Sequence, residues 1–285
     1  MVATAARTSS SVALLNAAAC ASGEMLAGVT ALAGGTTAGV AGASVSFTPA
    51  AGNDWLVLSY AQVDITSTTL SYETRIVSTG TVAESTPLHQ LEGIATTEID
   101  AAGQGRVFGA LGAIAQSFSE NSIARDGTNN GTRLHSTVFA LNLNKFRNHA
   151  FAWTVAEIAG SATDYATNAQ TIAMTPDVAG DSWIAGNTGF EKNNASREFQ
   201  SRLQVGQPSL ADQPAGQTTA AYFLWGNRDA GDVMATPHQT VESLSAGSAA
   251  TANIDTSIDS TTNAPGVSNR SLWAVTMELP AVAGG

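Results

Sequence analysis

The sequence predicts an all-β protein of two tandem, duplicated antiparallel β-sandwich or jelly-roll-like domains that follow a short N-terminal arm. The first observation behind this is a repeat. The segment Thr48–Trp55 returns as Thr175–Trp183, with an offset of 127 at the Thr-Pro pair (175 minus 48) and 128 at the tryptophan (183 minus 55). The second observation is that many short apolar runs alternate with turn residues, and the third is that helix signals are short everywhere.

Three further pairs of segments support the repeat. They are Tyr72–Ile76 with Phe199–Leu203, Val29–Gly34 with Val155–Gly160, and Thr137–Leu141 with Leu272–Thr276. The shared features are apolar framework positions and turn residues, whereas no cluster of histidine, cysteine or carboxylates recurs. Because the scaffold repeats but no cluster of chemically active residues does, the repeat favours a structural or binding role over a catalytic one.

The individual strands follow from short apolar runs and from alternation of apolar and polar residues. Trp55–Tyr60 follows a Gly-Asn-Asp turn and is expected to be a buried strand. The segment Tyr72–Ile76 alternates as a half-buried strand does. The long polar stretch Gly247–Asn269 is interpreted as a loop. Further strands are expected at Val107–Leu111, Tyr222–Trp225, Thr137–Leu143 and Leu272–Leu279.

The boundaries of the domains follow from turn-rich and small-residue segments. A short helix is expected over Val12–Ala21, because a serine run precedes it and Gly23 follows it. From Met25 to Gly42 glycine recurs too often for a stable helix, so strand and loop are expected there. Asn144–Asn148 is the expected linker. The predicted parts are an arm over 1–23, a first β-sandwich over 24–147 and a second over 148–285.

The composition excludes several classes of protein. Only 12% of the residues are charged, against about 25% in ordinary soluble domains. Small polar side chains replace lysine and glutamate, and they lose little entropy when another surface covers them. The net charge of −11 argues against binding to nucleic acid. No stretch approaches the ~20 apolar residues of a membrane span, and the single cysteine, Cys20, excludes an internal disulfide.

No motif of a catalytic, metal or cofactor site is recognisable, so no catalytic residue, metal or cofactor is predicted. The histidines lack zinc-binding spacing; His89 and His238 follow Pro-Leu or Pro and are expected on surface loops. Asp126–Gly131 partly resembles a calcium loop, but it lacks the acidic residue at its twelfth position, so a hairpin turn is the simpler interpretation. Carboxylates that could form a hydrolytic pair have no feature that distinguishes them from solvated acids: Glu92, Glu98, Asp100, Glu157 and Asp164.

A small set of residues is expected at contacts with other subunits or with a larger assembly. Arg75 and Arg202 recur in the repeat, and each could pair with a nearby acid such as Glu73 or Glu198 or anchor an interface. Trp55 and Trp183 recur with the apolar framework and are expected in the core. The candidates for contact are Arg75, Arg202, Trp225, Arg228, Leu14 and Leu15, the last two on the N-terminal arm.

Low charge, richness in Ala, Thr, Ser and Gly, tandem β units and an Ala-rich N-terminal arm together resemble virion proteins of tailed bacteriophages, above all capsid decoration (cement) proteins. The resemblance implies a non-enzymatic homotrimer on the outer surface of a virion assembled in the host cytoplasm. Its partner would be the major capsid protein of the phage shell, with no nucleic acid and no membrane. The alternatives are a tail or baseplate component, a secreted carbohydrate-binding module and a polysaccharide hydrolase.

Overall fold

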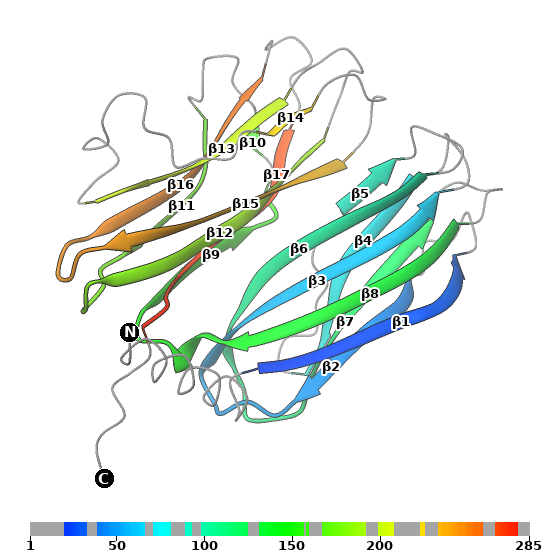
Figure 1. Cartoon of the computed structure of the whole chain (residues 1–285), viewed down its shortest axis with the longest axis horizontal. Coiled ribbons are helices and arrows are strands. Elements are labelled where there is room, and N and C mark those ends of the chain that lie inside the picture. Colours follow the sequence, from blue (N-terminus) through cyan, green and yellow to red (C-terminus); the bar gives the residue numbers. More distant parts are fainter. Residues whose placement is uncertain are drawn as a thin grey trace, which may run out of the picture.

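A computed structural model shows a molecule built almost entirely from β-strands (Figure 1). The structure describes twelve segments, and every structural statement here concerns these residues. They are 20–32, 39–65, 71–80, 89–92, 98–124, 131–156, 158–159, 167–191, 199–207, 223–225, 233–258 and 266–278. Leu14, Leu15, Arg228 and the loop at Asp126 lie outside them.

Unit 1 is an eight-stranded sandwich of two antiparallel sheets. Sheet A has the strand order β1-β8-β3-β6 and sheet B the order β2-β7-β4-β5. This order is the jelly-roll connectivity, in which two Greek keys build two packed sheets. The strands are β1 (Cys20–Leu32), β2 (Val40–Phe47), β3 (Asn53–Ile65), β4 (Ser71–Thr79), β5 (His89–Glu92), β6 (Glu98–Leu111), β7 (Gln116–Ala124) and β8 (Gly131–Asn142).

Unit 2 has the same connectivity, so the predicted pair of jelly-roll-like β-sandwiches is confirmed as a fold. Sheet C has the order β10-β17-β12-β15, with β9 also paired to β17, and sheet D has the order β11-β16-β13-β14. The strands are β9 (His149–Thr154), β10 (Ile158–Ala159), β11 (Thr167–Met174), β12 (Gly180–Glu191), β13 (Phe199–Gly206), β14 (Phe223–Trp225), β15 (Val233–Leu244), β16 (Ala250–Ile258) and β17 (Gly266–Thr276).

Each strand sends alternate side chains into its own sandwich and outward. On β3, Trp55 and Val57 point into the core of unit 1, whereas Leu56 belongs to a second apolar cluster on the outside of sheet A. On β12, Ile184 points into the core of unit 2 and Ala185 belongs to that same outer cluster. Sheets A and C are therefore apolar on both faces where they meet.

The segments that repeat in the sequence lie on corresponding strands of the two units. Both Thr-Pro segments form the turn between the second and third strands of their unit, and Tyr72–Ile76 and Phe199–Leu203 lie on β4 and β13. Thr137–Leu141 lies on β8 and Leu272–Thr276 on β17. The shared connectivity is a likeness of fold, and duplication of the sequence stays a prediction.

Two local expectations are wrong. Cys20 and Ala21 belong to β1, paired with Leu141 and Ala140, so no helix runs through Ala21. Most of the expected loop Gly247–Asn269 that the structure describes is strand: β16 and the start of β17. Alternation in β16 is inconspicuous because two of its inward positions are alanines, Ala250 and Ala252, whose small side chains give only a weak apolar signal.

The expected linker Asn144–Asn148 is a packed connection. A 3-10 turn over Leu143–Lys145 begins after Asn142, whose side chain accepts a hydrogen bond from the Asn144 amide. Leu143 is fully buried between the two units, and Phe146 packs against the same cluster. The side chain of Asn144 accepts a hydrogen bond of 2.6 Å from the Asp54 amide in β3. This connection therefore fixes the start of unit 2 against unit 1.

Candidate functional site

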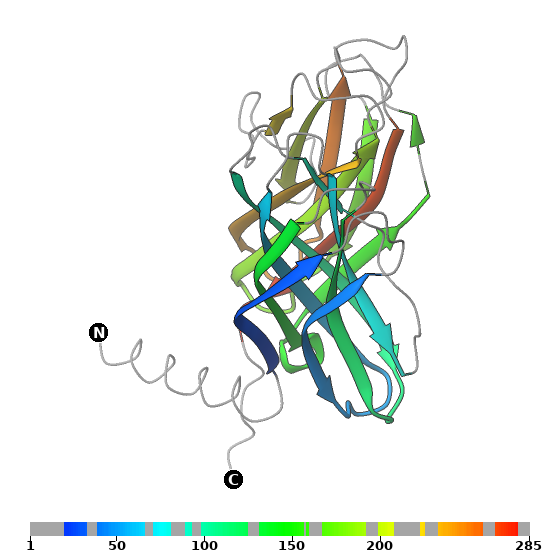
Figure 2. The same cartoon turned by 90° about the vertical axis from the view of Figure 1, so that its right-hand side faces the viewer.

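The two units meet through the outer faces of sheets A and C. Strand β6, at the edge of sheet A, contacts β9, β17, β12 and β15 (Figure 1). In the view turned by 90°, the strands of unit 1 lie in front of those of unit 2 (Figure 2). Both units contribute residues to the apolar cluster between them. Its members are Leu56, Val107, Leu141, Leu143, Ala185, Trp273 and Val275, with Leu58, Phe146, Phe151 and Trp183 packed around it.

Hydrogen bonds at the centre of this junction join the main chain of β6 to two side chains of unit 2. The Gly105 amide donates to Oδ1 of Asn187 at 3.2 Å. The Ser271 hydroxyl lies 2.7 Å from the Gly105 carbonyl oxygen and 2.8 Å from the same Asn187 oxygen. Gly105 must be a glycine, because a Cβ atom there would lie 2.6 Å from atoms of both Leu58 and Trp273. Both Asn187 and Ser271 are buried.

Charged and aromatic side chains join the units on either side of this centre. The Arg106 guanidinium of β6 lies between two rings, 4.4 Å from the centroid of Phe108 and 3.1 Å from that of Trp153 in β9. Such cation–π contacts strengthen when the cation is buried, as Arg106 is. Nε2 of His149 in β9 lies 2.9 Å from the Asp54 carboxylate of β3. Together these contacts hold the two sandwiches as one block.

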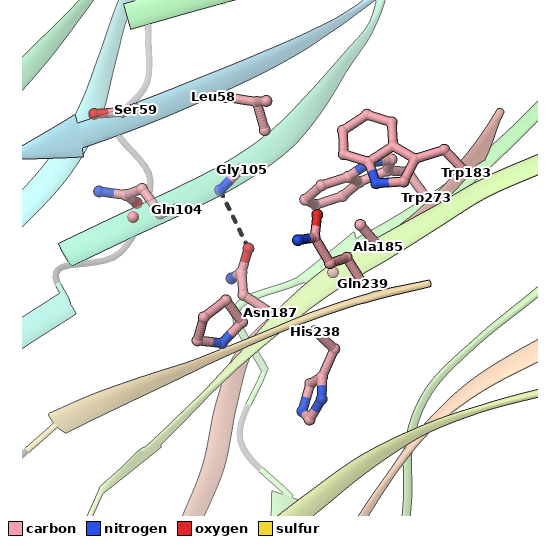
Figure 3. Close-up of a pocket in the computed structure, with 13 residues that line it drawn as sticks. Leu58, Ser59, Gln104, Gly105, Trp183, Ala185, Asn187, His238, Gln239 and Trp273 are labelled. Atoms are coloured by element: carbon pink, nitrogen blue, oxygen red, sulfur yellow. Dashed lines mark hydrogen bonds between the residues drawn. The ribbon is translucent and has the colours of Figure 1, made fainter. Parts of the chain in front are cut away.

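A groove of about 450 Å³ lies between the units beside this contact. Figure 3 shows Trp183 and Trp273 along one side of it, with Leu58 and Gly105 opposite and Asn187 and Gln239 between them. Volumes of this order are typical of small-molecule sites. None of its lining residues is an aspartate, glutamate, lysine or arginine: Leu58, Ser59, Gly103, Gln104, Gly105, Trp183, Ala185, Gly186, Asn187, Pro237, His238, Gln239 and Trp273.

Trp183 lies in this groove because of a shift of one residue in the repeat. The residue at an offset of 127 from Trp55 is Ser182 (55 plus 127), and Ser182 is the fully buried residue that faces inward. A shift of one position sends a side chain to the opposite face of a sheet. Trp55 is in the core as expected, but the expectation that Trp183 is a core residue is wrong. Its ring is half-buried and meets Trp273 edge-on, with centroids 5.9 Å apart.

His238 was expected on a surface loop, and this expectation is also wrong. It lies on β15, is 3% exposed and points into unit 2, where its Nε2 is 2.7 Å from the Ser201 hydroxyl. The preceding Pro237 suggested a loop, but β15 is the edge strand of sheet C, where proline is tolerated.

The interior of unit 1 holds an ion pair that the sequence did not reveal. Arg133 on β8 and Glu120 on β7 are 1% and 0% exposed, with Nη1 and Oε2 3.1 Å apart. Arg133 also donates to the carbonyl oxygens of Val40 and Ala41, each at 2.8 Å. Burial raises the pKa of Glu120, and the hydroxyls of Ser122 and Thr74 and the Arg133 charge oppose that rise. This network is structural, since both charges are enclosed in the sandwich.

Of the residues predicted to make contacts, the structure describes the side chains of two. Arg202 pairs with Asp255 across β13 and β16, at 3.3 Å. Burial raises the pKa of Asp255 and the Arg202 charge opposes this. At the aligned position Arg75 stands opposite Asn121 in the ladder, and its Nε atom is buried without a hydrogen-bond partner among the described residues. Trp225 ends β14, and its side chain lies outside the description, as do Leu14, Leu15 and Arg228.

No group of three or more His, Cys, Asp or Glu side chains among the described residues is placed to hold a metal ion. No helix in that part of the chain has the length and apolar character to cross a bilayer.

No family model matches the chain, and no curated protein matches it in sequence. Similar solved structures include N-glycanase F (PNGase F), at 9% identity and a TM-score of 0.41 over 93% of this chain and 97% of that one. The T13 viral particle of IBDV matches at 10% identity and 0.31, over 90% and 68%. The CBM22 tandem domain of Paenibacillus barcinonensis Xyn10C matches at 8% and 0.24, over 89% and 94%. TM-scores this low carry no argument about function.

Proposed function

We propose that this chain is a non-enzymatic structural protein of a virus particle, which binds an assembled phage capsid from outside and stabilises it as a decoration protein. Its partner in this proposal is the major capsid protein, and the protein acts as a homotrimer. The composition supports this role, because few charges and many small polar side chains give a surface that loses little conformational entropy when an assembly covers it.

The observation that carries the proposal is the fixed junction between two units of the same fold. The shared apolar cluster and the hydrogen bonds at Gly105 hold the two jelly rolls in one arrangement. A trimer of such chains presents six similar β units at fixed positions. Many modest contacts made together give an attachment far stronger than any one of them. Stiffening of a shell requires a rigid bridge, and this junction provides one.

The first test is the solution mass, measured by light scattering after size exclusion. The proposal predicts a trimer of three chains of 29.0 kDa. The second test is co-sedimentation with empty, expanded capsids of a tailed phage, with isolated tails as a parallel sample. Binding to capsids that raises their melting temperature supports the proposal. Binding to tails alone would replace it with a tail or baseplate role, and a monomer that sediments with neither would overturn it.

Arg75 and Arg202 offer a matched pair of variants for the sedimentation test. Arg202 is paired with Asp255 within the chain, whereas Arg75 stands opposite the uncharged Asn121 at the aligned position. Arg75→Ala is therefore expected to weaken capsid binding more than Arg202→Ala does. Equal binding by both variants and the unmodified chain would exclude Arg75 on sheet B and Arg202 on sheet D from the contact.

A further inference from the structure

We infer that the groove between the two units is a binding site for a short, uncharged oligosaccharide, with Trp183 as the platform for a sugar ring. The inference rests on the groove alone and is independent of capsid binding. Three properties of the groove carry it: none of its lining residues is an aspartate, glutamate, lysine or arginine, it presents a fixed aromatic ring, and it offers side-chain amides beside bare main chain.

The neutral lining selects a neutral ligand. His238 contributes no charge to the groove surface, because its ring points into unit 2 toward Ser201. A charged ligand that entered would lose its hydration with no opposite charge to compensate for it. Phosphorylated, sulfated and acidic ligands are therefore excluded.

The aromatic ring is held in position before any ligand binds. Trp183 is half-buried, and its edge-on contact with the buried Trp273 fixes its orientation. A pyranose ring has an apolar face of C–H groups that packs on an exposed indole, while the hydroxyls at its rim remain polar. Tyr60 lies outside the groove, directly opposite Gly103 in the ladder between β3 and β6, and is 37% exposed. It supplies a second amphipathic ring where a longer chain of sugars would leave the groove.

The polar groups suit hydroxyls better than they suit a purely apolar ligand. Gln239 is exposed on β15, and Figure 3 shows it beneath the two tryptophans. A side-chain amide both donates and accepts hydrogen bonds, as sugar hydroxyls do. Gly103 leaves the opposite wall bare, because a Cβ atom there would meet only the Ser59 carbonyl oxygen, at 3.8 Å. This space is open to a ligand.

The test is isothermal titration calorimetry of the full chain with neutral trisaccharides. The probes are maltotriose, cellotriose, mannotriose and triacetylchitotriose, with 3′-sialyllactose as the charged counterpart. We expect binding of at least one neutral probe and none of the charged one. Trp183→Ala should weaken that binding by about tenfold or more, as loss of a central aromatic contact does. Ile114→Ala, which alters an exposed apolar residue outside the groove, is the control and should change nothing.

A second variant keeps the test decisive if Trp183→Ala disturbs the junction. Gly103→Leu places a side chain in open space, so it should fold normally and block the groove. Absence of binding by all four neutral probes would overturn the inference, as would equal binding by Gly103→Leu and the unmodified chain, or stronger binding of the charged sugar. Trimer formation and capsid binding are expected to survive both variants, which separates this inference from the proposed function.

Discussion

The interiors of unit 1 and unit 2 have the same strand order but contain different polar groups. Thr74 and Ser201 occupy aligned positions on β4 and β13 (74 plus 127), and both are buried. Thr74 donates to the Glu120 carboxylate at 3.0 Å, whereas Ser201 is hydrogen-bonded to His238 on β15. One inward hydroxyl thus contacts a carboxylate in unit 1 and a histidine in unit 2.

The difference extends to the neighbouring strand. Glu120 stands opposite Ile76 and Ile254 stands opposite Leu203, so an isoleucine takes the place of the carboxylate in unit 2. Each unit still buries an arginine on its last strand. Arg133 has Glu120, but among the described residues the 7% exposed Arg270 donates only to the carbonyl oxygens of Ala169 and Ala156. The jelly roll therefore does not need the ion pair as such, because in unit 2 main-chain carbonyl oxygens accept hydrogen bonds from the buried guanidinium without a carboxylate beside it.

Glu120→Ile gives unit 1 the isoleucine that unit 2 has at the corresponding position, and it is expected to have the largest effect on stability. Arg133 would keep its two carbonyl partners but lose its counter-charge at 1% exposure. Removing one partner of a buried ion pair costs about 3–5 kcal/mol. Urea denaturation should show this loss in the free energy of unfolding. The double variant Glu120→Ile with Arg133→Met, which removes both charges, should recover most of it; an unchanged single variant would show that carbonyls alone suffice in unit 1 too.

Arg270→Met should have a smaller effect, because it leaves no buried charge behind. It removes the donors to the carbonyl oxygens of Ala169 and Ala156, at 2.6 and 2.8 Å. Ala169 is buried, and an unsatisfied buried acceptor costs about 1–3 kcal/mol, whereas Ala156 is exposed and its carbonyl oxygen is open to water. Burial lowers the pKa of Arg270, so part of that loss is offset by removing a cation that is costly to bury. The same denaturation experiment on Arg133→Met, which leaves Glu120 without its counter-charge, provides the comparison. A larger loss of stability in Arg270→Met than in Arg133→Met would contradict the prediction.

The sequence predicted the fold because repetition and alternation can both be read directly from the order of residues in the chain. Inward apolar residues such as Val57 and Ile184 recur at matching places in the two units. The buried Arg133–Glu120 pair gave no such signal, because inward charges look in sequence like the outward charges of a half-buried strand. Its only trace is that Glu120 follows Phe118 at the inward spacing of two.

The groove could not be predicted, because it depends on how the outer faces of two sheets meet. Leu58, Trp183 and Gln239 are far apart in the chain, and nothing in their spacing brings them together. The repeat also misled: alignment of Trp183 with Trp55 hid a shift of one residue, and that shift turns the ring from the core to the groove. Register is set by strand pairing, and a gap in an alignment does not record it.

The pH dependence of stability is the smallest of the expected effects, and it compares one carboxyl in each unit. Burial raises the pKa of Glu120 above its usual 4.5 and that of Asp255 above 3.8. Between the usual value and the raised one, the folded chain holds more protons than the unfolded chain. The free energy of unfolding therefore falls as the pH rises through that interval, and it levels off above the raised pKa.

Glu120→Gln and Asp255→Asn should each remove one part of this slope, and the part removed should be larger for Glu120, whose side chain is fully buried. Urea midpoints measured across the acidic range provide the test, with the slope rather than the absolute stability as the readout, because both variants also lose an ion pair. If the free energy of unfolding of the unmodified chain rises with pH instead, the charges of Arg133 and Arg202 lower the pKa values of their carboxylate partners by more than burial raises them. The ionised forms of Glu120 and Asp255 would then stabilise both units, and the two units would differ only in which residues carry the charge.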